Sequence, residues 1–393
     1  MQDRDWKAIL KKVGISFGVI SIIFTVTVGG FIVANLQHMG RLARVVQLVQ
    51  GDYLEKASFG QLIDGATRGI VDSLGDPYSV YMDAQENAQL MEQIEGKFGG
   101  VGIILSLKDP KKLTVLRPIK NTPAAKAGLE PGDVIMKIDS QDATTIDQEK
   151  AVSLMRGDPG TKVTLVVYRD SAKKTLTVPL TREPISVPTV EGEALPGNSD
   201  LAYIDISQFS TNTANELASV LKNMDMSKYK GIVLDLRYNH GGELDAAVGV
   251  ASYFVKPGPV VYIVDNQGRT VTKSAEGNFL GKPFVVLVNE ESASASEIVS
   301  GAIKDEGTGT LVGVKTFGKG IVQTIFPLDS GTSVKLTTAK YLTPNKVDIH
   351  KKGIEPDVKA ELKKGEEATI SPTDRNYDSQ LTQAVQILRS KIK

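Results

Sequence analysis

The strongest constraint on the fold is a regular alternation of strand-like and helix-like segments after residue 200. Short apolar runs with strand character alternate with amphipathic runs of helical spacing, in the order "LAYIDISQF" (201–209), "TANELASVLKNM" (213–224), "GIVLDL" (231–236), "ELDAAVGVASYFV" (243–255) and "PFVVLV" (283–288). Such alternation is typical of an α/β layer built around a parallel sheet. In sheets of this kind, ligands bind in loops at the carboxyl ends of the strands. Functional side chains are therefore expected in those loops.

An apolar segment near the N-terminus predicts a membrane anchor. Residues 13–40 contain no lysine, arginine, aspartate or glutamate and are mostly apolar as far as Leu36. About 20 apolar residues suffice to span a bilayer. Basic residues concentrate before the segment, which predicts a short cytoplasmic tail, contact with membrane lipid and an extracytoplasmic remainder. A cleaved signal peptide is the alternative interpretation.

Changes in periodicity and turn content divide the 393 residues into five parts. The tail and anchor occupy residues 1–40, a helical segment occupies 41–97, and a small domain of short strands occupies 98–184. An α/β core follows over 185–362, and a helical tail over 363–393. The helical segment and the tail are candidates for contacts between copies of the chain.

Composition excludes several classes of function. Lys+Arg and Asp+Glu are both 46, so the chain offers no charged field for nucleic acid. The absence of cysteine excludes disulfides, thiolate metal sites and cysteine nucleophiles. Three scattered histidines do not form a metal motif, and nothing in the sequence calls for a metal or nucleotide cofactor.

The loop after residue 288, "NEESASASEIVSG", raises the question of whether a serine performs chemistry. Ser294 and Glu297 fit the capping box S-x-x-E, in which serine only caps a helix. The same position also favours catalysis, because the first N–H groups of a helix can stabilise an oxyanion. A serine nucleophile needs a base, however. His240, in the loop after residue 236, is one candidate for this base.

Lys319 offers a different base, because it lies between glycines among apolar residues and desolvation lowers the pKa of a lysine. The flanking glycines favour extended backbone. Period-two geometry would then place Lys319, Ile321 and Gln323 on one face. The side-chain oxygen of Gln323 could hold the amine without adding a charge.

The strand-rich part resembles a PDZ domain through "FGGVGIIL" (98–105), "NTPAAKAGLEPGDVIMKIDS" (121–140) and the helix that ends at 155–157. The resemblance implies a mostly antiparallel domain with two helices, in which an extended peptide adds to a sheet edge and a glycine-bearing loop holds its carboxylate. The residues implied in peptide binding are Phe98, Gly99, Gly100, Val101, Gly102 and Ile103. Arg156 matches a PDZ arginine that couples peptide binding to activation in similar proteases.

Residues 41–359 as a whole resemble the carboxyl-terminal processing (tail-specific) serine proteases. The motifs are "SASASEIVSGAIKD", "VGVKTFGKGIVQT", "LDLRYNHGGELDAAVGVASYFV" and "YLTPNKVDIHKKGIEPD". The resemblance implies an α/β protease core with crotonase/ClpP-like layering. It implies that Ser294 is the nucleophile, Lys319 the general base and Gln323 the residue that orients the lysine. The implied oxyanion hole consists of backbone N–H groups at Gly241 or Gly242 and at Ala295.

Together these inferences predict a membrane-anchored serine endopeptidase that recognises free, apolar C-termini of protein or peptide substrates through its PDZ domain. The alternative is a catalytically inactive PDZ scaffold that works by binding partners alone.

Overall fold

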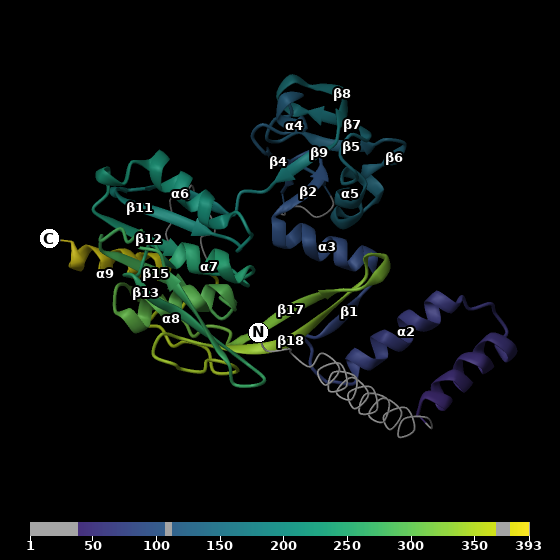
Figure 1. The fold of residues 1–393 in the computed structure, drawn as a ribbon. Helices are drawn as coiled ribbons and strands as arrows, with labels where there is room; N and C mark the ends of the chain where they lie inside the picture. The colour runs from purple at the N-terminus through teal and green to yellow at the C-terminus, as the bar shows by residue number, and fades with distance from the viewer. Residues whose placement is uncertain (1–37, 107–111, 367–377, 393) are drawn as a thin grey trace, which may run out of the picture. The chain divides into compact units, whose positions relative to one another are not determined.

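The computed structural model describes residues 38–106, 112–366 and 378–392, which fall into two compact units divided after Pro77. The first unit contains helical residues 38–52 and helix α2 (Phe59–Asp72), shown in Figure 1. Helix α2 starts with a capping box, in which Ser58 and Gln61 each accept a backbone hydrogen bond from the other. Several of its apolar side chains are exposed, but the predicted contact between copies of the chain stays a prediction.

The prediction of a transmembrane helix within residues 13–40 is not supported by the structure and is corrected here. Across the described ranges, every helix is too short or too polar to cross a bilayer. Arg41 and Arg44, in the described helical residues 38–52, are exposed and follow the predicted segment. Residues 13–37 of the predicted segment lie outside the described residues. The fold class is therefore corrected to the PDZ and α/β parts, and the extracytoplasmic location of the core stays a prediction.

Residues 97–186 form the small antiparallel domain that the PDZ resemblance implied. Its strands pair in antiparallel fashion as β2–β9, β3–β4 and β6–β5–β7–β8. The elements are β2 (Lys97–Gly100), β3 (Ile103–Leu105), β4 (Val115–Pro118), α4 (Pro123–Lys126), β5 (Val134–Ile138), β6 (Gln141–Asp142), η1 (Ala143–Thr145), α5 (Gln148–Met155), β7 (Lys162–Arg169), η2 (Asp170–Ala172), β8 (Lys174–Thr181) and β9 (Glu183–Ser186). A separate buried cluster fills its interior. The two predicted α-helices correspond to α4 and α5.

A six-stranded sheet forms the centre of the following domain, in the order β10-β11-β12-β15-β16-β19. All its neighbouring pairs are parallel except the edge pair β10–β11, which confirms the predicted α/β layer. The strands are β10 (Val190–Leu195), β11 (Asn198–Ile206), β12 (Gly231–Asp235), β15 (Phe284–Val288), β16 (Thr310–Gly313) and β19 (Val358–Lys359).

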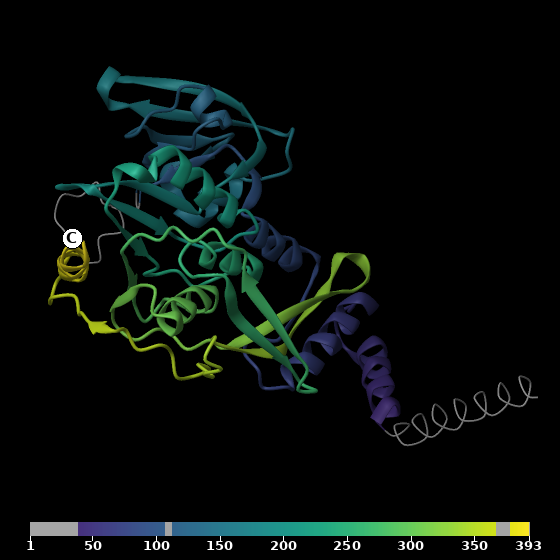
Figure 2. The same cartoon turned by 60° about the vertical axis from the view of Figure 1, so that its left-hand side comes forward.

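Helices cover both faces of this sheet (Figures 1 and 2). Helices α6 (Thr213–Met224), α7 (Leu244–Ala251) and α8 (Ala295–Glu306) pack on the face that carries Ile204 and Leu234. The C-terminal helix α9 (Ser379–Lys391) packs on the opposite face, against Tyr203 and Val233. Successive residues of a strand point to opposite faces, so each fully buried strand contributes to both cores. The C-terminal helix was predicted from its apolar spacing.

A second sheet supplies the other wall of the candidate site. Its order is β1-β18-β13-β14, with β17 also paired to β18. The elements are β1 (Val80–Met82), β13 (Gly258–Asp265), β14 (Thr270–Ala275), β17 (Ile321–Pro327), η4 (Asp329–Gly331) and β18 (Ser333–Leu342). Strands β17 and β18 form one long hairpin in Figures 1 and 2. Strand β1, with helix α3 (Ala84–Glu95) after it, lies in the segment expected to be only helical.

A buried ion cluster fastens helix α9 to the central sheet. The Arg237 guanidinium, at the end of β12, donates to Asp235 at 2.7 Å and to Asp378 at 2.9 Å. Asp378 also caps α9, because its carboxylate accepts from the Leu381 N–H at 2.8 Å. The Tyr203 hydroxyl donates to the same Asp235 oxygen, Oδ2, at 2.7 Å. These bonds join the C-terminal helix to the strand end that leads into the glycine loop 239–242.

Asp378→Ala is expected to lower the free energy of unfolding by about 3 to 5 kcal/mol, because it leaves Arg237 buried without this partner. Urea titration of the purified protein measures the loss. Asp170→Ala is the matched control, since it breaks the fully exposed pair with Lys173 and should leave the transition nearly unchanged. Equal midpoints for the two variants would contradict the structural importance of the buried cluster.

Candidate active site

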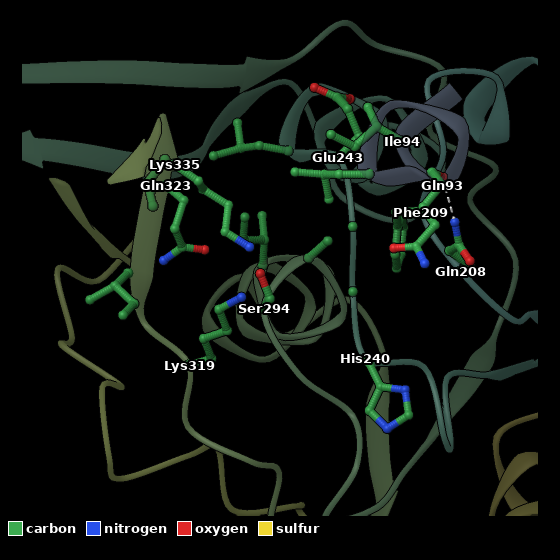
Figure 3. Close-up of a pocket in the computed structure, with 18 of the residues that line it drawn as sticks. Gln93, Ile94, Gln208, Phe209, His240, Glu243, Ser294, Lys319, Gln323 and Lys335 are labelled. Atoms are coloured by element: carbon green, nitrogen blue, oxygen red, sulfur yellow. Dashed lines mark hydrogen bonds between the residues drawn. The ribbon is translucent and has the colours of Figure 1, made fainter. Parts of the chain in front are cut away.

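One pocket of about 630 Å³ collects the residues that the sequence singled out for chemistry. Ser294, Lys319 and Gln323 all line it, and so do the oxyanion candidates Gly241, Gly242 and Ala295. These six residues come from three segments of the chain. Figure 3 shows the pocket, with Ser294 near its centre. The α/β core thus brings together residues separated by up to 82 positions in sequence, counted from Gly241 to Gln323.

The structure distinguishes the three serines of "SASAS". Ser292 and Ser296 are fully buried, and their hydroxyls donate at 2.8 Å to the backbone carbonyls of Leu236 and Asn239, respectively. Both therefore tie the serine loop to the segment that follows β12, and Ser296 does so at the first residue of the glycine loop. Ser294 alone is partly exposed, and it lines the pocket at the N-cap of α8. Its φ of 54° is unusual for a residue with a side chain, and such strain concentrates at functional sites.

Backbone N–H groups beside Ser294 differ in their availability. Ala295 starts α8, and the described residues offer no recorded acceptor to its N–H or to that of Gly242. The Gly241 N–H, in contrast, donates to the Asn239 side chain at 2.8 Å. Gly241 has a φ of 96°, and a Cβ on it would lie 2.6 Å from the Ala293 carbonyl oxygen. Glycine is thus required for the close approach of the loops, while Gly242 and Ala295 have the N–H groups left for an oxyanion.

Lys319 occupies the loop just before β17, and its amine points toward the Ser294 hydroxyl in Figure 3. Burial lowers the pKa of the Lys319 amine, and the nearby charge of Lys335 lowers it further, whereas the Glu297 carboxylate opposes the change. The amine lies 5.0 Å from the centre of the Tyr78 ring. Within the described structure, no hydrogen bond joins Lys319 to Ser294.

Gln323 shares the pocket with Lys319, although Lys319 itself precedes the strand. The ladder shifts register between Val322 and Gln323, so the simple period-two pattern does not continue through the strand. In Figure 3 the amide oxygen of Gln323 is directed toward the Lys319 and Lys335 amines. Its Nε2 is buried and has no hydrogen-bond partner among the described residues. The oxygen is therefore placed as an acceptor for an amine that moves toward it.

Glu297 is a central residue of the site whose role the sequence did not reveal. Its fully buried carboxylate accepts from the backbone N–H of Ser294 at 2.9 Å and from that of Lys319 at 2.8 Å. It also accepts from the Thr316 hydroxyl at 2.6 Å and from the Gly318 N–H at 2.8 Å. One side chain thus positions both candidate catalytic residues. The S-x-x-E pattern gave the only sequence signal, and it was interpreted as a helix cap.

Tyr341, on β18, makes the complementary connection. Its hydroxyl lies 2.6 Å from the Lys319 carbonyl oxygen and 3.0 Å from the Ser294 carbonyl oxygen. Burial raises the pKa of the Tyr341 hydroxyl, and the Glu297 charge adds to the effect. The group therefore stays protonated and acts as a donor. No local motif marks this tyrosine, since its role depends on contacts made across the fold.

His240 does not approach Ser294. Its exposed imidazole lies 2.9 Å, through Nε2, from the Glu291 carboxylate, and it points away from Ser294 in Figure 3. The geometry gives no support to the histidine alternative. In the described ranges, no group of three His, Cys, Asp or Glu side chains is arranged to hold a metal ion.

The residues implied in peptide binding lie in β2, β3 and the turn between them. A Cβ on Gly102, where φ is 79°, would lie 2.3 Å from the Thr122 side chain, so this turn requires glycine. Phe98, Gly99 and Gly100 belong to β2, Ile103 belongs to β3, and Val101 is buried between the strands. Strand β3 has β4 as its one recorded partner in the described structure, which leaves its other edge unpaired.

Arg156 lies at the end of α5 and not in the catalytic pocket. Its guanidinium stacks 4.4 Å from the centre of the Phe98 ring and lies 3.7 Å from the Glu92 carboxylate of α3. Helix α3 itself lines the pocket through Leu90 and, about one turn further on, through Gln93 and Ile94. Arg156 therefore connects the implied peptide-binding loop to a helix that lines the same pocket as Ser294.

Comparison with known families agrees with this arrangement. The sequence model described as peptidase family S41 matches residues 200–360. A PDZ domain model matches residues 99–180, and a model described as the activating protease CtpB N-terminal domain matches residues 30–86.

Curated relatives extend these matches over most of the chain. The carboxy-terminal processing protease CtpA of Bacillus subtilis is 38% identical over 341 residues, which cover 86% of this chain and 72% of the relative. CtpB of the same organism is 36% identical over 324 residues, covering 81% and 67%, respectively. The fold resembles that of an S41-type protein from Bacteroides fragilis, with a TM-score of 0.53, 17% identity and coverage of 87% and 92%. The chain therefore belongs to peptidase family S41, and it is a serine-type peptidase of the carboxy-terminal processing group with a PDZ domain.

Proposed function

We propose that this peptidase cleaves peptide bonds with Ser294 as nucleophile and Lys319 as general base, after its PDZ domain has bound the free C-terminus of a substrate. The observation that carries the proposal is the shared pocket, in which the backbones of Ser294 and Lys319 are joined through Glu297. Burial of Lys319 supports its role, because a lysine can accept a proton only as the neutral amine.

In the acylation step, the Lys319 amine takes the proton from the Ser294 hydroxyl while Oγ attacks the substrate carbonyl carbon. The carbonyl oxygen becomes an oxyanion and accepts hydrogen bonds from the Gly242 and Ala295 N–H groups. When this intermediate collapses, the C–N bond breaks and the Lys319 ammonium donates its proton to the leaving amine. An acyl-enzyme on Ser294 remains.

In the deacylation step, the neutral Lys319 amine takes a proton from water, which attacks the acyl carbon. Collapse of the second intermediate releases the carboxylic acid, and the proton returns through Lys319 to Ser294 Oγ. Gln323 assists by accepting a hydrogen bond from the amine, since its oxygen is directed toward it. A neutral acceptor suits this position, because a carboxylate would keep the lysine protonated.

Substrate docking is the step that aligns the site. An extended, apolar tail adds to the unpaired edge of β3, and the glycine-bearing turn holds its carboxylate. Arg156 contacts both Phe98 of that region and Glu92 of α3, so a displaced tail-binding loop also displaces the helix beside the pocket. Before docking, the Lys319 amine lies over the Tyr78 ring, an arrangement that favours the ammonium form. Alignment with Ser294 removes it from that ring.

Ser294→Ala and Lys319→Ala are each expected to reduce the digestion of casein by roughly 10⁴-fold or more, because each removes a group that takes part in bond cleavage. The loss is measured as the release of labelled fragments from casein. The enzyme is either residues 41–393 or the full chain. Lys315→Ala is the matched control on the same loop, since its amine pairs with Glu355 outside the pocket and activity should persist. Digestion by Ser294→Ala at the parent rate would refute the assignment.

Activity is expected to rise with pH through the lowered pKa of Lys319. Below that pKa the amine is protonated and cannot accept the serine proton, and above it the neutral base is present. The pH dependence of kcat/KM, recorded where the fold is intact by circular dichroism, tests this direction. The same rising limb should persist in His240→Ala. A decline above neutral pH without unfolding, or a limb lost with His240, would contradict a lysine base.

Glu297→Gln is expected to lower kcat/KM by about 100-fold. Each oxygen of the carboxylate accepts hydrogen bonds from two donors, and the NH₂ group of glutamine would face two of these donors without being able to accept from them. Steady-state kinetics, together with a thermal unfolding curve, separates lost alignment from lost folding. Glu306→Gln, on the exposed end of the same helix, should behave like the parent protein. Parent-like kinetics in Glu297→Gln would show that the carboxylate does not align the site.

A further inference from the structure

A second lysine enters the pocket from strand β18. Lys335 lines the same cavity as Ser294 and Lys319, and Figure 3 shows its amine directed toward both. Neither the serine loop nor the lysine loop contributes this residue. It lies in "SVKLT", a strand sequence without catalytic character.

The backbone position of Lys335 explains why its side chain extends into the pocket. Strand β18 is paired on both sides at this point, with Val80 of β1 and Ile325 of β17 opposite Lys335. The lysine therefore lies in the interior of the sheet, between apolar neighbours, and not on a free edge. Its aliphatic stem can pack there while the ammonium group reaches the polar cavity.

The Lys335 amine has no recorded carboxylate partner within the described part of the chain. Lys340, on the same strand, does have such a partner, because its amine lies 3.4 Å from the Asp348 carboxylate. Because no carboxylate of the described residues neutralises it there, the Lys335 charge can shift the pKa of other titratable groups in the pocket. One group that it affects is Lys319, whose pKa is lowered first by burial and then by the Lys335 charge.

We propose that Lys335 is a positioning residue of the active site, whose ammonium charge holds Lys319 in the neutral form that accepts the serine proton. This inference rests on the proposed role of Lys319 as general base. The physical basis is repulsion between like charges, which disfavours the second ammonium group in a partly desolvated pocket. Lys335 acts through Lys319 and takes no proton from Ser294 itself.

The other charged and titratable groups around Lys319 do not repel its ammonium form as Lys335 does. Glu297 of α8 favours the ammonium form, and so does the Tyr78 ring. Tyr341 of β18 stays protonated and neutral. Glu243 and His240 line the same cavity from the segment before α7. Among all these groups, Lys335 is the one cation directed at the Lys319 amine in the described structure, so it offsets the two groups that favour protonation.

The test compares pH profiles of kcat and KM for the full-length parent and for Lys335→Met, on a fluorogenic peptide with a free apolar C-terminus. Methionine keeps the length of the stem and removes the charge. The rising limb of kcat should move to higher pH, with a loss of roughly fivefold at pH 7 that recovers on the alkaline plateau. Lys335→Arg keeps the charge and should keep the parent limb.

Lys340→Met, on the same strand but outside the pocket, is the matched control and should leave the limb in place. A uniform loss at every pH, a change in KM alone or an unmoved limb in Lys335→Met would each overturn the proposal. Lys319→Ala, measured alongside, separates the two levels of inference. Substantial activity in Lys319→Ala would refute the lysine base itself, whereas an inactive Lys319→Ala with an unmoved Lys335→Met limb refutes only the role of Lys335.

Discussion

Two loops that leave different strands meet at the buried carboxylate of Glu297. The first loop carries Ser294 into helix α8, and the second carries Lys319 into strand β17. Each donates a backbone N–H to the same carboxylate oxygen, and the second loop adds two further donors to the other oxygen. A buried carboxylate is costly unless it is saturated with donors, so this group is stable only when both loops are in place. Tyr341 strengthens the arrangement, because its hydroxyl lies within hydrogen-bonding distance of the carbonyl groups of Ser294 and Lys319. The backbone geometry of the pair is therefore fixed before any substrate binds.

The side chains remain adjustable where the backbones do not. Lys319 experiences opposing influences: burial and the Lys335 charge favour the neutral amine, whereas Glu297 and the Tyr78 ring favour the ammonium ion. Such a balance suits a base that must accept a proton in one step and donate it in the next. In the proposed mechanism, a modest movement of the amine from the Tyr78 ring toward Ser294 would change both its distance to the serine hydroxyl and its preferred charge state.

Peptide recognition and the pocket share a physical connection in helix α3. The helix lines the cavity, and it is tied to the core because the Gln208 side chain donates to the Gln93 carbonyl at 2.8 Å. At the same time it provides Glu92, which lies near Arg156 at the end of the PDZ helix α5. Arg156 itself stacks on Phe98, beside the turn that would hold a carboxylate. In the proposed function, a substrate tail would contact a residue network that reaches the pocket of Ser294 through α3, without any need for Arg156 to enter the site.

The sequence by itself determined the parts of this protein that depend on local patterns. Alternating apolar and helical spacing predicted the parallel sheet, glycine-rich turns and short strands predicted the PDZ domain, and motif context singled out Ser294 and Lys319. The tertiary structure alone decided which groups surround them. Glu297 had the sequence signal of a helix cap, and Tyr341 and Lys335 had none, because their roles arise from contacts between residues far apart in the chain. The choice between Gly241 and Gly242 likewise depended on the hydrogen bond that the Gly241 N–H donates to the Asn239 side chain. The existence of strand β1 depended on its pairing with β18. Periodicity records which face of an element is buried, but it carries no information about which distant charge or hydroxyl that face will meet.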